Sequence, residues 1–136
     1  MTTTEQSTLY SLDSSTGLLP IGAIARTLGV HPRTLRIYDQ QNILIPQRSE
    51  GDRRIYSFDD VEKAKLIQFL TRNLALNLSG VKIILAMLEE MKLKPKEYLQ
   101  YVQKIAEIAN IDTDIQQIHI KKTSKRGRKA KSKKEN

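Results

Sequence analysis

The stretch that decides the fold runs from Ile21 to Asp39 and reads IGAIARTLGVHPRTLRIYD. The apolar residues of its first half follow the spacing i, i+3, i+4, i+7: Ile21, Ile24, Ala25 and Leu28. This spacing predicts a short helix with one apolar face, ended by Gly29. His31 is expected to cap a second helix, with Pro32 in the first turn, where no N–H donor is needed. Two short helices joined by a tight glycine-containing turn indicate a helix-turn-helix.

The second helix, from Pro32 to about Gln41, carries the side chains that could recognise DNA. Arg33 and Arg36 lie three residues apart on one face, with Thr34 and Tyr38 beside them. Arginine binds guanine edges or phosphates in a major groove, and threonine contacts a thymine methyl group or a phosphate. A short surface helix with two solvated arginines would show the same residues, so the pattern alone leaves both interpretations open.

The residues after this helix predict an extended segment, 43–46, followed by a tight hairpin around Gly51. The basic and aromatic side chains of this hairpin are Arg48, Arg53, Arg54 and Tyr56. Arginines on a tight loop beside a helix-turn-helix are typical of a wing that holds backbone phosphates. The alternative is an ordinary charged turn, since Glu50 and Asp52 nearly neutralise the arginines.

Three further helices are expected. Ser57 or Asp59 can cap the first, from Asp60 to about Asn73, whose apolar residues spread over much of its circumference and predict cover on more than one side. Asn77 is expected to cap the second. A last helix begins after Pro95 and runs through Ile108, with a continuation to Ile115 or Ile118 left open.

The last helix is expected to form a dimer interface. Its apolar residues are Tyr98, Tyr101, Val102, Ile105 and Ile108. A helix of this length is unstable alone with a bare apolar face, and the sequence offers no other obvious surface for these side chains. We therefore predict a dimerisation helix over residues 95–120.

The charge of the chain is concentrated at its end. Residues 121–136 hold nine Lys/Arg and one acid, whereas residues 1–120 hold fourteen bases and fourteen acids. We expect this tail to be disordered and to contact DNA through Lys125, Arg126 and Arg128. Generic phosphate binding, minor-groove binding by a segment similar to an AT-hook (Arg126–Arg128), and a merely solubilising tail all stay open. Residues 1–17, rich in Thr, Ser and Gln, are also expected to be disordered.

Several classes of protein are excluded by what the sequence lacks. With no cysteine and only two histidines, far apart, a metal site is not expected. No nucleophile–base pair or phosphate loop indicates an enzyme, and no cofactor is expected. No apolar run approaches the ~20 residues that a membrane span needs, and no secretory signal is visible. We therefore expect a cytoplasmic protein without a membrane partner.

Residues 18–91 resemble the N-terminal DNA-binding domain of the MerR family of transcription regulators. The resemblance rests on four blocks in order: IGAIARTLGV, HPRTLRIYD, EGDRRIYSFDDV and LNLSGVKIIL. Within the family these blocks are most similar to the HspR heat-shock repressor group. Two positions depart from the family: Arg53 stands where Tyr is frequent in the wing, and Pro20 where a Ser or Thr cap is usual.

The resemblance implies a mainly α fold: a MerR-like winged helix-turn-helix with a small β-hairpin wing and a C-terminal dimerisation helix. It also implies a homodimer that binds an inverted repeat in double-stranded DNA. The residues on the family's DNA-contact positions are Arg33, Thr34, Arg36, Tyr38, Arg54 and Tyr56. For the HspR group it further implies repression and a corepressor of the DnaK chaperone type.

The leading hypothesis is thus a sequence-specific transcription regulator, a repressor of HspR type. A DNA-architectural, chromosome-anchoring or excisionase-like protein could use the same winged fold, and would spread along DNA instead of choosing one operator. An adaptor for a chaperone or another partner, with a vestigial helix-turn-helix, would have no affinity for DNA at moderate salt.

Overall fold

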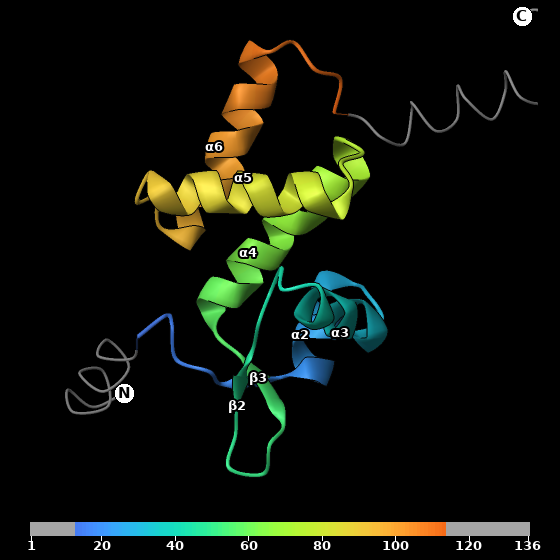
Figure 1. Cartoon of the computed structure of the whole chain (residues 1–136), viewed down its shortest axis with the longest axis vertical. Helices are drawn as coiled ribbons and strands as arrows, with labels where there is room; N and C mark the ends of the chain where they lie inside the picture. Colours follow the sequence, from blue (N-terminus) through green and yellow to red (C-terminus); the bar gives the residue numbers. More distant parts are fainter. Residues whose placement is uncertain (1–12, 114–136) are drawn as a thin grey trace, which may run out of the picture.

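A computed structural model describes residues 13–113 and confirms a mainly helical fold with a small sheet. The elements in chain order are β1 (Leu19–Pro20), α2 (Ile21–Leu28), α3 (Pro32–Gln40), β2 (Gln47–Arg48), β3 (Arg54–Tyr56), α4 (Phe58–Gln68), the π-helical η1 (Phe69–Asn73), α5 (Leu78–Glu90) and α6 (Pro95–Ile108). The helix-turn-helix and the sheet lie at one end of the molecule, α5 and α6 lie at the other, and α4 joins the two ends (Figure 1).

The helix-turn-helix forms as the sequence predicts. Gly29 ends α2 with a φ of 69°, a left-handed conformation that a glycine adopts without strain, and its N–H donates to carbonyl groups of the last turn. His31 then caps α3, because its Nδ1 accepts a hydrogen bond of 3.0 Å from the N–H of Arg33. Pro20 makes no side-chain cap for α2.

The wing is a three-stranded antiparallel sheet in the order β1-β3-β2, one strand more than the sequence predicts. Leu19 pairs with Tyr56, and Gln47 pairs with Ile55. Pro20 fits here because β1 is an edge strand, where a residue without an N–H donor is tolerated. The extra strand ties the start of the helix-turn-helix to the wing.

Residues 13–17 are folded, although the sequence analysis includes them in the disordered segment 1–17. The Nε2 of Gln47 donates a hydrogen bond of 2.6 Å to the carbonyl of Ser15, and the N–H of Asp59 donates to the carbonyl of Ser14 at 3.0 Å. The partners lie more than thirty residues away in the chain, so local composition could not reveal them. Residues 1–12 lie outside the described part.

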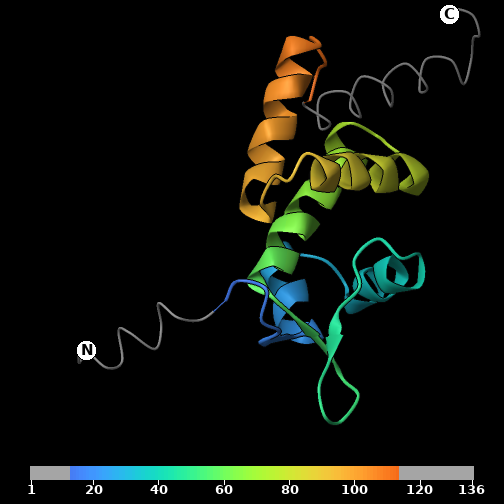
Figure 2. The ribbon, with the colours of Figure 1, turned by 60° about the vertical axis from the view of Figure 1, so that its left-hand side comes forward.

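Helix α4 is the central element of the core. Ser57, one of the two candidate caps, begins it through a capping box with Asp60. Leu66, Ile67 and Leu70 are fully buried along α4 and η1, and α4 packs against α2 on one side and α6 on another. This confirms that the helix is covered on more than one side, and Figure 2 shows it between the two ends of the molecule.

Helix α6 is shorter than the dimerisation helix that the sequence predicts over residues 95–120. It ends at Ile108, and Asn110 follows in the left-handed region with a φ of 60°. The N–H of Ile111 donates back to the carbonyl of Ala106, which closes the helix in the manner of a C-terminal cap. The helix therefore does not continue through Asn110, because an asparagine can adopt this capping conformation at little cost. Ile115 and Ile118, to which a continuation was left open, lie outside the described residues.

Within residues 13–113, none of the helices has the length and apolar character needed to cross a membrane. The same part of the chain holds no group of three or more His, Cys, Asp or Glu side chains placed to bind a metal ion.

Candidate DNA-binding surface

Helix α3 has one buried face and one exposed basic face. Leu35 and Tyr38 point into the core, which fixes the rotation of the helix. Arg33 and Arg36 are exposed on the other side, and Thr34 is partly exposed. The structure thus brings these three predicted residues together on a surface that a DNA groove could reach.

Tyr38 differs from its neighbours on α3 because most of its side chain is buried in the core. Burial raises the pKa of its phenol, and the nearby charge of Arg72 partly opposes the shift. Its backbone carbonyl accepts hydrogen bonds from the N–H groups of Ile43 and Leu44. Tyr38 therefore holds the end of α3 in place, and little of its side chain is available for a contact with DNA.

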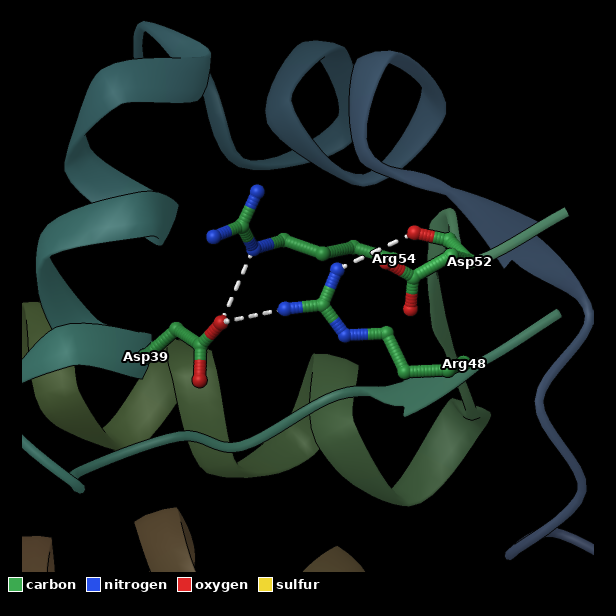
Figure 3. A network of polar contacts seen from close by, with 4 residues as sticks. All are labelled: Asp39, Arg48, Asp52 and Arg54. Atoms are coloured by element: carbon green, nitrogen blue, oxygen red, sulfur yellow. Dashed lines mark hydrogen bonds and ion pairs between the residues drawn. The ribbon is translucent and has the colours of Figure 1, made fainter.

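An ionic cluster joins α3 to the wing (Figure 3). The Nε of Arg54, on β3, donates to Oδ2 of Asp39 at 2.8 Å. The Nη2 of Arg48, on β2, lies 3.5 Å from the same oxygen, and its Nη1 donates to the carbonyl of Asp52 at 3.2 Å. One carboxylate of the helix therefore holds two arginines of the wing.

The cluster orients the arginines without neutralising them. Two guanidinium groups share one carboxylate, so the cluster keeps a net positive charge. Asp39 and Arg54 are both partly shielded from water, which strengthens their charge-assisted hydrogen bond relative to a fully exposed pair. Asp39 thus sets the distance between the basic face of α3 and the basic side chains of the wing.

The sequence by itself indicates no role for Asp39, which is marked only by its place in the block HPRTLRIYD. An acidic residue at the end of a basic helix is a weak signal, because its partners are nine and fifteen residues further along the chain. Their approach depends on how the hairpin packs beside α3.

The tip of the wing carries Arg53. Its backbone exchanges hydrogen bonds with Ser49, and Asp52 completes the turn with a φ of 61°. The side chain of Arg53 is exposed and, among the described residues, makes no ion pair. This position suits a phosphate contact.

Tyr56 lies at the base of the wing with 0% of its surface exposed. Its hydroxyl is buried and has no hydrogen-bond partner in the described part of the chain. Burial is the main cause that raises the pKa of its phenol to about 12, and the charge of Arg54 partly opposes it. A direct contact with DNA, which the sequence analysis assigned to Tyr56, would require this hydroxyl to become exposed.

The predicted dimerisation residues separate into two groups. Tyr98 and Val102, exposed by 4% and 7%, are buried in the core of the same protomer, where α6 packs against α4. The premise that they have no surface to cover in their own chain is therefore wrong. Ile105 and Ile108 are exposed by 42% and 70%, and Tyr101 is half-buried. The predicted tail contacts Lys125, Arg126 and Arg128 lie outside the described residues.

Comparison with known proteins agrees with this arrangement. Residues 19–88 match the family described as "MerR HTH family regulatory protein". The chain is 37% identical over 76 residues to a putative heat shock protein HspR of Streptomyces coelicolor, a match that covers 56% of this chain and 50% of that protein. It is 35% identical over 92 residues to the HTH-type transcriptional regulator GlnR of Bacillus cereus, covering 66% and 70%.

A third relative is the HTH-type transcriptional regulator ZntR of Escherichia coli, 28% identical over 109 residues, with 73% of this chain and 77% of that protein covered. The chain thus spans about half the length of the HspR protein and a larger share of the other two. The family match over residues 19–88 includes the helix-turn-helix and the wing described above.

Proposed function

The chain belongs to the family of MerR HTH regulatory proteins, and we propose that it is a sequence-specific DNA-binding transcription regulator. The observation that carries the proposal is the exposed basic face of α3, with Arg33 and Arg36, held beside the wing by the Asp39 cluster. A helix of this kind enters a major groove, and the wing contacts the adjacent phosphates. Arg36 and Arg33 are assigned to base edges, and Arg53 and Arg54 to the backbone.

The regulator acts as a homodimer on an inverted repeat. Apolar side chains that a monomer would leave in water support this part of the proposal: Ile83 and Met87 on α5, Met91 at its C-cap, and Ile105 and Ile108 on α6. Exposed apolar residues in such number mark a contact surface between proteins. A twofold-symmetric dimer places its two recognition helices on two half-sites of the same sequence.

The regulator is a repressor of HspR type. The printed name of the Streptomyces relative, a putative heat shock protein, supports this assignment, as does the similarity of the four sequence blocks. The regulators GlnR and ZntR match the same chain, so the comparison favours the family more strongly than the subgroup. A DnaK-type chaperone as corepressor stays a prediction from the resemblance.

Selection of bound sequences from a random DNA library tests the proposal. The wild-type protein should enrich one inverted repeat, and Arg36→Ala should lose most of the preference for it, since a bidentate contact discriminates bases by ~1–3 kcal/mol. Lys104→Ala removes the same charge from the exposed surface of α6 and should leave the preference intact. Enrichment of no sequence would favour the DNA-architectural alternative, and no binding at all would favour the adaptor.

A further inference from the structure

A pocket of about 300 Å³ lies apart from the basic surface of α3 and the wing. Four segments line it: the connection after α3 through Ile43, α4 through Lys63, α5 through Leu85, and α6 through Tyr98. Its volume is at the lower end of the range that small-molecule sites occupy. None of the residues assigned above to DNA lines it.

Two of the three charged residues that line this pocket are cationic. Lys63 of α4 and Lys82 of α5 both line it, and within residues 13–113 neither makes an ion pair. Lys65, two residues from Lys63, is by contrast paired with Glu62 at 3.3 Å. Glu89 is the one acidic residue of the pocket lining, so the site keeps a net positive charge.

The rest of the lining is apolar. Ile43 and Tyr98 are buried core residues, and Leu85 is partly buried. Small-molecule sites combine such apolar walls with a few polar groups that fix orientation. Lys63 and Lys82 can supply these polar groups, because each ammonium group has three N–H donors and, within residues 13–113, no ion-pair partner.

We infer that this pocket binds a small organic anion: a carboxylate or a phosphate monoester on an apolar body. The oxyanion lies between Lys63 and Lys82, and the apolar body packs against Leu85 and the ring of Tyr98. Glu89 repels ligands with further negative charge, which disfavours polyphosphates.

The pocket adjoins the end of the recognition helix. Asn42, with a φ of 58°, and Ile43 follow the C-cap of α3. The N–H of Ile43 donates to the carbonyl of Tyr38 at 2.8 Å. A bound anion thus connects the last turn of α3 to α4 and α5. The inference that a bound anion changes DNA affinity rests on the proposed function, whereas the inference that the pocket binds an anion does not.

The test titrates the whole chain with two probes, benzoate and phenyl phosphate, and measures their binding by methyl NMR. We expect the methyl signals of Ile43 and Leu85 to shift and saturate, while those of Ile108 stay unchanged. Lys63→Gln and Lys82→Gln should each weaken the affinity about fivefold or more, because each removes a charge-assisted contact. Lys65→Gln is the matched control on α4 and should bind as the wild type. The probe that binds with the higher affinity identifies the class of oxyanion, carboxylate or phosphate.

Shifts that do not saturate, or equal affinities in Lys63→Gln, Lys82→Gln and Lys65→Gln, would overturn the inference. Thermal unfolding of each variant should match that of the wild type, since Lys82 is exposed and Lys63 half-buried. In a second measurement, the better probe should change DNA affinity in the wild type, and Lys82→Gln should need about fivefold or more of the probe for the same change. Pocket binding without any effect on DNA affinity would overturn the coupling to α3. Failure of the proposed function would appear separately, as absence of DNA binding without any probe.

Discussion

Arg54 on the wing donates a hydrogen bond of 2.8 Å from its Nε to Oδ2 of Asp39 at the end of the recognition helix. The same oxygen lies 3.5 Å from Nη2 of Arg48. The pair fixes the position of the wing relative to the helix that carries Arg33 and Arg36. A protein that must place two basic surfaces on neighbouring parts of a duplex depends on such a fixed distance.

Asp39→Asn should therefore reduce sequence preference more than overall affinity. The amide cannot hold two guanidinium groups, so the wing is released, while the loss of a negative charge favours binding to any DNA. The cost in folding stability should be about 1 kcal/mol, because the pair is partly exposed. The ratio of affinities for the selected site and random DNA measures the effect.

Asp52→Asn is the matched control for this variant. Asp52→Asn also removes one negative charge, but Asp52 contacts Arg48 only through its backbone carbonyl, which the substitution keeps. Asparagine also tolerates the φ of 61° at this position. An equal loss of preference in both variants would mean that charge, and not the position of the wing, determines the preference.

Tyr56→Phe should stabilise the protein at neutral pH by about 1 kcal/mol, since a buried hydroxyl without a partner carries an uncompensated desolvation cost. Urea unfolding measures the change. If the hydroxyl instead contacts DNA, the same variant should lose DNA affinity, so a binding titration separates the two roles of Tyr56.

Stability should fall steeply at alkaline pH. In the folded state Tyr56 keeps its proton up to about pH 12, whereas the unfolded chain releases it near the ordinary tyrosine pKa of 10.0. The unfolded state therefore binds fewer protons above pH 10, and stability is lost as the pH rises from 10 towards 12, at up to ~1.4 kcal/mol per pH unit. Burial also raises the pKa of Tyr38 and Tyr98, so Tyr56→Phe should reduce the slope without abolishing it. A wild-type slope of zero over this range would contradict the burial of these phenols.

Ile108→Glu should yield monomers that remain folded. The side chain is 70% exposed on α6, so a charge there disturbs a partner surface and not the core. Sedimentation velocity measures the oligomeric state, and Gln103→Glu, an exposed charge elsewhere on the same helix, is the control. Dimers of unchanged affinity in Ile108→Glu would place the interface elsewhere, with the exposed Ile83 and Met87 of α5 as the next candidate.

Removal of residues 121–136 should weaken DNA binding at low salt and leave sequence preference nearly unchanged. The residues deleted hold nine Lys/Arg, whereas residues 1–120 are formally neutral. Each phosphate that the tail neutralises adds about 0.9 to the slope of log K against log salt. Titrations at several salt concentrations measure that slope, and an identical slope with and without the tail would show that the tail does not contact DNA.

The local sequence determined the elements of the DNA-binding half. The apolar spacing of 21–28, the turn at Gly29 and the cap at His31 all act within a few residues, and the structure confirms each of them. Backbone conformation and capping depend on near neighbours, so these features can be predicted from the chain alone. The exposed arginines of α3 follow in turn, because the apolar positions fix which face is buried.

Only the tertiary structure decided which residues meet across the chain. It paired Asp39 with Arg48 and Arg54, added β1 to the wing, and buried Tyr56. It also turned Tyr98 and Val102 towards α4, although an apolar stripe on a helix fits a partner subunit as well as the same protomer. Hydrophobic burial is not directional, so an amphipathic pattern predicts that a face is covered and leaves open what covers it.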